Sequence, residues 1–156
     1  MDTYAIHYNA PIGRLYIAES DGFLVYVGFE PLVGALPKEA PLILHTAALL
    51  DDYFAGKLRN FELPIKLNGT DFQLKAWDAL LSIPYGCTLT YKEQAKIVGN
   101  AQASRAVGAA NGKNPISIIV PCHRVIGSNG SLIGYGGGLD KKQALLDLEK
   151  SVIDSK

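Results

Sequence analysis

The residues with the clearest chemical potential are a cysteine, a histidine and an arginine that follow one another at positions 122–124. A thiolate is a strong nucleophile, and neighbouring positive charge lowers the pKa of a thiol, so this triplet predicts a reactive Cys122. The alternative is a buried cysteine that packs as a small apolar side chain, as many free cysteines do. From Cys122 alone both interpretations stay open.

The residues around this triplet indicate how it is positioned. Residues 116–120 are mostly apolar and β-branched, which is typical of a buried strand, and Pro121 would end that strand. Adjacent residues on an extended chain point to opposite faces, so a bridging water is a more natural link between Cys122 and His123 than a direct bond. Glu149 falls on or beside the buried face of a helix predicted over 140–153, where a carboxylate needs a partner. It is either a surface glutamate or the partner of a protonated His123.

Length and composition limit the class of protein. A chain of 156 residues forms one large or two small domains. No apolar stretch approaches the ~20 residues of a membrane span, and no secretory signal is visible. Two cysteines make no disulfide framework, so we expect a cytoplasmic protein, or a nuclear one in a eukaryote. Three scattered histidines without a Cys-x-x-Cys pair predict no metal site.

The net charge of zero conceals a difference between the two halves of the chain. Residues 1–70 carry 5 basic and 8 acidic side chains, whereas residues 71–156 carry 10 and 7. Within 91–124 the only acidic residue is Glu93, against five basic ones. A basic region of this kind attracts phosphates, although an ordinary solvated surface has the same composition.

The first half of the chain predicts a small α/β domain over residues 1–60. Strand-like stretches cover 4–9, 14–19 and 23–29, and the last two are separated by an Asp-Gly turn signal. Helical spacing of apolar residues follows over 42–54. Residues 57–69 then form the connection to a second domain, over 70–156.

The second domain begins with a capping-box pattern at Thr70, and the pattern recurs at Thr90. Helices are therefore predicted over 70–83 and 90–98, and a third over 101–111 after a Gly-Asn turn. Two short helices joined by such a turn form a helix-turn-helix. The fold class is thus α+β: a sheet-and-helix N-terminal domain, and a mostly helical C-terminal domain with a short active-site strand.

The third helix, AQASRAVGAAN, contains one long side chain, Arg105, among small residues. Small residues permit close packing against other helices of the same domain. They also permit a helix, ~10–12 Å across with ordinary side chains, to enter a widened minor groove, which is ~6 Å wide in B-DNA. Arg105 could then insert into the base stack when a nucleotide is extruded.

Several of these motifs together resemble the O6-alkylguanine-DNA alkyltransferases. The resemblance covers about residues 70–150 and rests on Pro-Cys-His-Arg-Val at 121–125, preceded by Asn-Pro at 114–115. It includes Phe-Gln at 72–73, Trp77, Ile-Pro at 83–84, Thr-Tyr at 90–91, Arg-Ala-Val-Gly at 105–108, Gly-Gly-Leu at 137–139 and Glu149. The first 60 residues resemble the family's ribonuclease-H-like domain only in their order of strands and helix.

This resemblance implies a role for each matching residue. Cys122 would accept the alkyl group, His123 would deprotonate it through a water, and Glu149 would orient His123. Asn114 would brace the turn and the active-site strand, and Tyr91 would donate a proton to the departing guanine. In the substrate pocket, Tyr135 would form a wall, Gly136 N–H would reach O6, and Val125 would contribute. The DNA-binding residues would be Arg105, in place of the extruded nucleotide, with Thr90, Ser104, Ala106 and Gly108.

The expected function is therefore single-turnover transfer of an alkyl group from O6-alkylguanine, and from O4-alkylthymine, in double-stranded DNA. A thiolate and a phenol suit this chemistry, because displacement at a saturated carbon needs a soft nucleophile and a proton for the departing base. The resulting thioether has no hydrolytic exit, so the protein would act once. We expect a monomer that needs no cofactor and no membrane.

Three alternatives remain. A related lesion-binding protein without transfer activity would carry tryptophan at position 122. A major-groove regulator would need base-reading side chains that the third helix lacks. A Cys-His hydrolase would turn over repeatedly.

Overall fold

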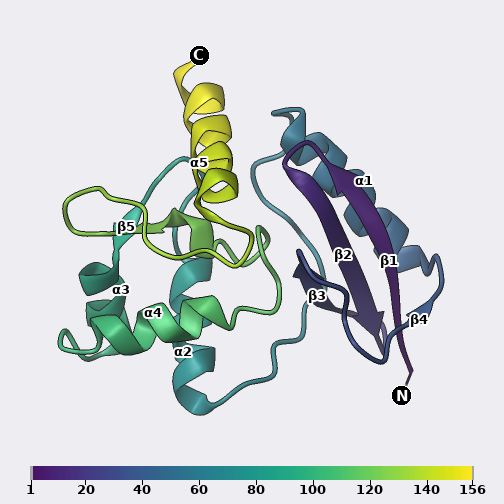
Figure 1. Ribbon diagram of the computed structural model, residues 1–156, viewed down its shortest axis with the longest axis horizontal. Coiled ribbons are helices and arrows are strands. Elements are labelled where there is room, and N and C mark those ends of the chain that lie inside the picture. Colours follow the sequence, from purple (N-terminus) through teal and green to yellow (C-terminus); the bar gives the residue numbers. More distant parts are fainter. Residues whose placement is uncertain (1, 156) are drawn as a thin grey trace. The chain divides into compact units, whose positions relative to one another are not determined.

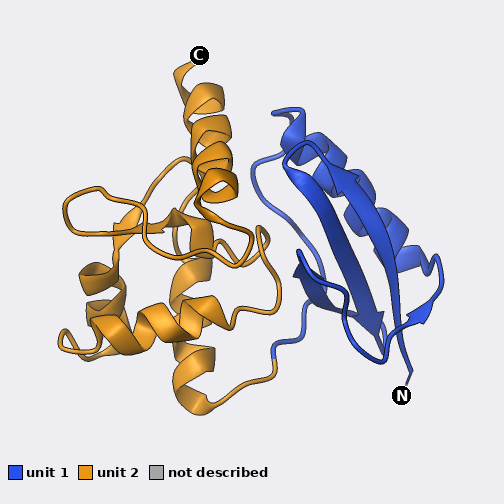
Figure 2. Cartoon of the chain, in the orientation of Figure 1, with its two compact units in different colours: residues 1–67 blue, residues 68–156 orange. Residues whose placement is uncertain are grey.

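The computed structural model describes residues 2–155, and the chain forms two compact units. Figure 2 shows them in separate colours: Met1–Leu67 and Asn68–Lys156, whose terminal residues 1 and 156 lie outside the described part. The domain bounds predicted from the sequence, 1–60 and 70–156, differ mainly in residues 61–67. These residues belong to the first unit, where Ile65 forms a parallel bridge with Leu24.

The first unit is a four-stranded sheet with one helix (Figure 1). Its strands are β1 (Thr3–Ala10), β2 (Gly13–Ser20), β3 (Phe23–Gly28) and β4 (Leu36–Pro37), in the order β3-β2-β1-β4. The three antiparallel strands lie where the alternating pattern predicted them. Asp21 and Gly22 both have positive φ, 54° and 80°, which the tight β2–β3 hairpin requires. Strand β4 has no recognisable pattern in the sequence, because it has only two residues and lies in a proline-rich segment.

Helix α1 (Pro41–Phe54) packs on this sheet through one apolar face. Ile43, Leu50 and Tyr53 are fully buried on that face, together with Leu15 and Ile17 of β2. The helix begins with proline in its first turn, where a missing N–H costs nothing.

The second unit is organised around three helices, α2 (Asp71–Leu81), α3 (Tyr91–Val98) and α4 (Ser104–Gly112). Both predicted capping boxes are present: the Thr70 side chain caps α2 with Gln73, and the Thr90 side chain caps α3 with Glu93. Gly99 ends α3 in a left-handed conformation, φ 107°, that favours glycine. The short connection to α4 completes the predicted helix-turn-helix, although α4 begins three residues later than expected.

Small residues bring these three helices close together. Ala76 of α2, Ala95 of α3, and Val107 and Ala110 of α4 form one buried cluster. Part of the small-residue pattern of α4 therefore serves internal packing. Other residues of α4 lie on the exposed side of the helix, where Arg105 and Ala106 contact solvent.

The strand expected before Cys122 is absent, and that prediction was wrong. Residues 116–120 form a turn, in which Ile118 adopts a left-handed φ of 72°. Asn114 satisfies the backbone of this turn: its Oδ1 accepts from Ile116 N–H at 3.0 Å and its Nδ2 donates to the Val120 carbonyl at 2.8 Å. The apolar residues signalled burial correctly, but a side-chain amide replaces the ladder partners of a strand.

Cys122–Arg124 then form a single 3₁₀ turn, followed by the short strand β6 (Val125–Ile126), which pairs in parallel with β5 (Leu89–Thr90). The last element is α5 (Leu139–Asp154), which buries Lys142, Leu145 and Glu149. Among residues 2–155, no helix is long and apolar enough to cross a membrane.

Candidate active site

Cys122 lies at the wall of a cavity of about 440 Å³ in the second unit. Its side chain is nearly buried, with 8% of the residue exposed. Besides Cys122, the lining comes from three places: Tyr91 at the start of α3, one face of α4, and the loop before α5. The lining residues are Tyr91, Ser104, Arg105, Gly108, Asn111, Gly112, Cys122, Ile133, Gly134, Tyr135 and Gly136.

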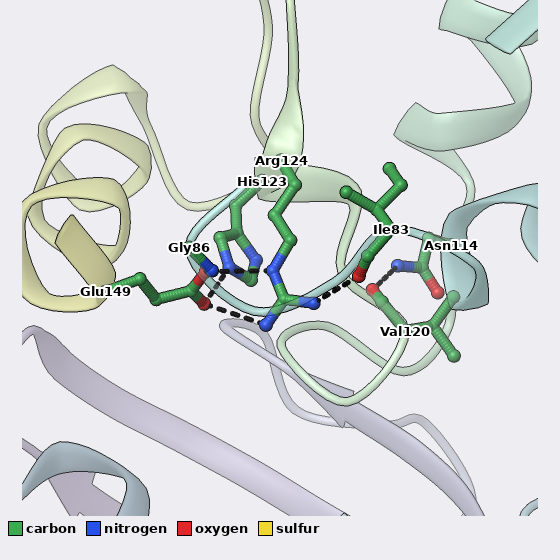
Figure 3. Close-up of polar contacts among 7 residues, drawn as sticks. All are labelled: Ile83, Gly86, Asn114, Val120, His123, Arg124 and Glu149. Carbon is green, nitrogen blue, oxygen red and sulfur yellow. Dashed lines mark hydrogen bonds and ion pairs between the residues drawn. The ribbon is translucent and has the colours of Figure 1, made fainter. Parts of the chain in front are cut away.

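In the 3₁₀ turn that begins with Cys122, the two consecutive side chains of His123 and Arg124 converge on the carboxylate of Glu149, as Figure 3 shows. His123 Nε2 lies 2.7 Å from Glu149 Oε2, and Arg124 Nε donates to Glu149 Oε1 at 2.8 Å. Arg124 Nη2 donates to Oε2 at 3.0 Å, and the Gly86 N–H donates to Oε1 at 3.1 Å. The remaining arginine nitrogen, Nη1, donates to the Ile83 carbonyl at 2.7 Å. The predicted pairing of Glu149 with His123 is thus present, and Arg124 is a third member that the sequence did not predict.

The charges in this network set which groups are ionised. Burial opposes ionisation of Glu149, but the hydrogen bonds and charges of His123 and Arg124 outweigh it and lower the carboxyl pKa to about 2. Burial lowers the pKa of His123, against the opposing influence of Glu149. His123 is therefore neutral near pH 7, and Glu149 is ionised. Because a carboxylate only accepts, the proton of the neutral imidazole resides on Nε2, which leaves Nδ1 with a lone pair.

The expectation of a lowered thiol pKa at Cys122 was wrong. Burial raises the pKa of Cys122, and the Asn114 amide and the charge of Lys142 offset this only in part. Arg124 does not supply the missing charge, because its guanidinium is turned toward Glu149. The thiol consequently needs a base. His123 Nδ1 is buried and, among the described residues, has no hydrogen-bond partner.

Tyr91 and Lys142 form a second polar cluster on the wall of the cavity. Tyr91 Oη donates to the Ile133 carbonyl at 2.6 Å, and burial raises its pKa, so the phenol stays protonated. Lys142, which is fully buried, donates to the carbonyls of Ile133 and Gly134 at 3.0 and 3.3 Å and to Tyr91 Oη at 3.4 Å. The loop before α5, whose Ile133 and Gly134 line the cavity, is thereby anchored to α5 and α3. Lys142 could not be recognised from the sequence, because it lies beside Lys141 in an ordinary amphipathic helix.

The other predicted site residues fall into two groups. Ser104, Arg105 and Gly108 of α4 and Tyr135 and Gly136 of the loop do line the cavity. Val125 is fully buried in β6 and is not among the lining residues, and neither are Thr90 and the exposed Ala106. Among residues 2–155, no cluster of three or more His, Cys, Asp or Glu side chains could hold a metal.

Comparison with known proteins identifies the class to which this fold and site belong. Residues 71–151 match the DNA-binding domain of 6-O-methylguanine DNA methyltransferase, and residues 3–67 match the ribonuclease-like domain of the same protein. The chain therefore belongs to the 6-O-methylguanine DNA methyltransferase family. This confirms the resemblance seen in the sequence and extends it to the N-terminal unit.

The most informative relatives carry one more specific name, methylated-DNA–protein-cysteine methyltransferase. The protein of Methanosarcina acetivorans is 48% identical over 156 residues, covering 95% of this chain and 98% of its own. That of Mycobacterium leprae is 50% identical over 148 residues, covering 91% and 89%. The crystal structure of Mycobacterium tuberculosis OGT in complex with DNA superposes with a TM-score of 0.89 at 46% identity, over 97% of this chain and 94% of that one. The predicted α+β fold class is confirmed by these neighbours.

Proposed function

We propose that this protein is a methylated-DNA–protein-cysteine methyltransferase, which repairs O6-alkylguanine in duplex DNA by taking the alkyl group onto Cys122. The family and the names of its relatives support this activity. The observation that carries the assignment to Cys122 is its position: the thiol is at the wall of the cavity, and the next residue along the chain, the neutral His123, is held by the ionised Glu149.

The reaction is a displacement at a saturated carbon. The Cys122 proton passes to His123 Nδ1 through a water molecule, and the resulting imidazolium is stabilised by Glu149. The sulfur forms a bond to the alkyl carbon as the bond between that carbon and O6 breaks. The electron pair stays on the guanine, which takes a proton from Tyr91 Oη, and Lys142 stabilises the tyrosinate. Guanine leaves as a neutral base, and the thioether on Cys122 is permanent, so each molecule acts once.

The surrounding residues position the nucleophile and the substrate. Asn114 braces the turn that presents Cys122. In the pocket, Tyr135 forms a wall, the Gly136 N–H reaches O6, and Val125 supports the pocket from the buried strand β6.

DNA binding is assigned to α4 in the minor groove, because its exposed face is small apart from Arg105. Ser104, Ala106, Gly108 and Thr90 approach the DNA backbone, and Arg105 occupies the position of the extruded nucleotide. We extend the substrates to O4-alkylthymine, and propose that the protein works as a monomer without cofactor or metal. Because its substrate is DNA and its thiol must stay reduced, we also propose a cytoplasmic location, or a nuclear one in a eukaryote.

Replacing the nucleophile separates binding from chemistry. Cys122→Ser should bind a methylated duplex with an affinity within about tenfold of wild type, or 1.4 kcal/mol, and transfer no label from it. Cys87→Ser, which changes the other, exposed cysteine, is the matched control and should transfer normally. Labelling of the Cys122→Ser variant would exclude Cys122 as the acceptor. Release of product beyond one equivalent would instead favour a Cys-His hydrolase.

The role of Arg105 is tested with two substrates, one of which must be extruded from the base stack before it reacts and one of which is a free base. Arg105→Ala should slow repair of O6-methylguanine in duplex DNA, where unstacking costs a few kcal/mol. Its rate with free O6-benzylguanine, which needs no extrusion, should hardly change. Lys92→Ala, which removes an exposed charge from α3, is the control for general phosphate attraction. Equal losses on the two substrates would rule out the extrusion role.

A further inference from the structure

A pair of buried side-chain amides joins α3 to α4 beside the cavity. Gln94 is fully buried, and Asn111 is 8% exposed. Gln94 Nε2 donates to Asn111 Oδ1 at 2.9 Å, and Asn111 Nδ2 donates to Gln94 Oε1 at 2.8 Å. Gln94 Nε2 donates its other hydrogen to the Ala76 carbonyl of α2 at 3.1 Å. Burying two amides is costly unless they are paired, and apolar side chains would join the helices more simply.

These contacts determine the orientation of both side-chain amides, that is, which atom is the nitrogen and which the oxygen. The Ala76 carbonyl can only accept, so the atom of Gln94 beside it must be the nitrogen. The atom of Asn111 that faces this nitrogen must then be the oxygen, and the Asn111 nitrogen is placed opposite Gln94 Oε1. Asn111 Nδ2 keeps a second hydrogen, which takes part in no hydrogen bond among the described residues.

Asn111 is also one of the residues that line the cavity containing Cys122. We propose that Asn111 is a substrate-recognition residue, whose free Nδ2–H donates to an acceptor atom of the extruded guanine, and that Gln94 is the positioning residue that fixes this donor. The proposal rests on the proposed function of the cavity. The side-chain amide of Asn111 adds a hydrogen-bond donor to the α4 side of the cavity, which favours a purine that presents an acceptor there.

A double-mutant cycle on free O6-benzylguanine tests this inference, because a free base needs neither DNA binding nor extrusion. We expect Asn111→Leu to lower the second-order rate of Cys122 alkylation roughly three- to tenfold, the worth of one hydrogen bond. Gln94→Leu should also lower it, because the amide of Asn111 is no longer held. The double variant, in which two apolar side chains replace the pair, should be no slower than Asn111→Leu alone. The fluorescence of the single tryptophan, Trp77, measures the folded fraction of each variant.

The possible results separate the inference from the proposed function. Folded Asn111→Leu or double variants that react at the wild-type rate would show that the pair is only structural and would overturn the inference. Additive losses in the double variant would overturn the positioning role of Gln94. If the wild-type protein itself does not alkylate Cys122, the proposed function fails first. Should Asn111→Leu not fold, the double variant compared with wild type still decides between recognition and packing.

Discussion

The buried carboxylate Glu149 should contribute strongly to the stability of the second unit. It accepts four hydrogen bonds, from His123, Arg124 and the Gly86 backbone. Its pKa falls from 4.5 to about 2, which corresponds to roughly 3 kcal/mol of folding free energy carried by the ionised form. Glu149→Gln removes that charge and leaves Arg124 buried without a counterion, for which losses of about 3–5 kcal/mol are typical. We therefore expect Glu149→Gln to lower the free energy of unfolding by about 3 kcal/mol at pH 7.

The pH dependence gives this prediction its sign. A group whose folded pKa is depressed contributes its full stabilisation above its unfolded pKa, here near 4.5, and loses it as the pH falls toward about 2. The difference between wild type and Glu149→Gln should therefore shrink by about 2 kcal/mol between pH 7 and pH 3. Urea unfolding followed by Trp77 fluorescence measures it, because this single tryptophan is buried in the same unit.

A matched substitution on the same helix controls for the loss of any negative charge. Asp147 is exposed and accepts one hydrogen bond, from Gln143, so Asp147→Asn should change stability by no more than about 0.5 kcal/mol. Equal stability of wild type and Glu149→Gln at pH 7, or a difference that stays constant down to pH 3, would refute the assigned role of the carboxylate.

Three further substitutions test other parts of the site. Thr90→Ala should destabilise the second unit by about 1 kcal/mol, measured by the same urea unfolding, because it removes the cap of α3; an unchanged midpoint would contradict this. Lys142→Met should slow alkylation by free O6-benzylguanine about tenfold or more. It should also speed hydrogen exchange in residues 131–136, since the Ile133 and Gly134 carbonyls lose their buried donor. Unchanged exchange would show that Lys142 does not anchor this loop. Tyr91→Phe should slow the same reaction about a hundredfold at unchanged stability of α3, and a wild-type rate would exclude Tyr91 as the proton donor.

Local signals in the sequence predicted most of the fold. Capping boxes at Thr70 and Thr90, the Asp21-Gly22 turn and alternating apolar residues act within a few positions, so the helices and the antiparallel hairpins were found. The turn over 116–120 was missed, because β-branched residues indicate burial and do not distinguish a strand from a turn held by Asn114.

Only those residues of the candidate site that belong to a recognisable motif or helix pattern could be predicted. Cys122, His123 and Glu149 were identified because they belong to a recognisable motif and an amphipathic helix. The contacts of Lys142 with Tyr91 and of Gln94 with Asn111 join residues 51 and 17 positions apart. Such pairs form only when the elements pack together, so no local sequence pattern predicts them. The pKa of Cys122 was mispredicted for the same reason: the burial that raises it arises only when the unit packs, and the neighbouring Arg124 pairs with a carboxylate that lies 25 positions along the chain.

The most direct test of the account is the stoichiometry and the site of alkylation. The intact protein is incubated with a large excess of O6-methylguanine duplex, and its mass and cysteine-containing peptides are followed until repair stops. We predict that repair stops at one equivalent, with every molecule heavier by one CH₂ and the added mass confined to the peptide that contains Cys122. Repair that continues past one equivalent, or a methyl group on Cys87, would contradict the central claim.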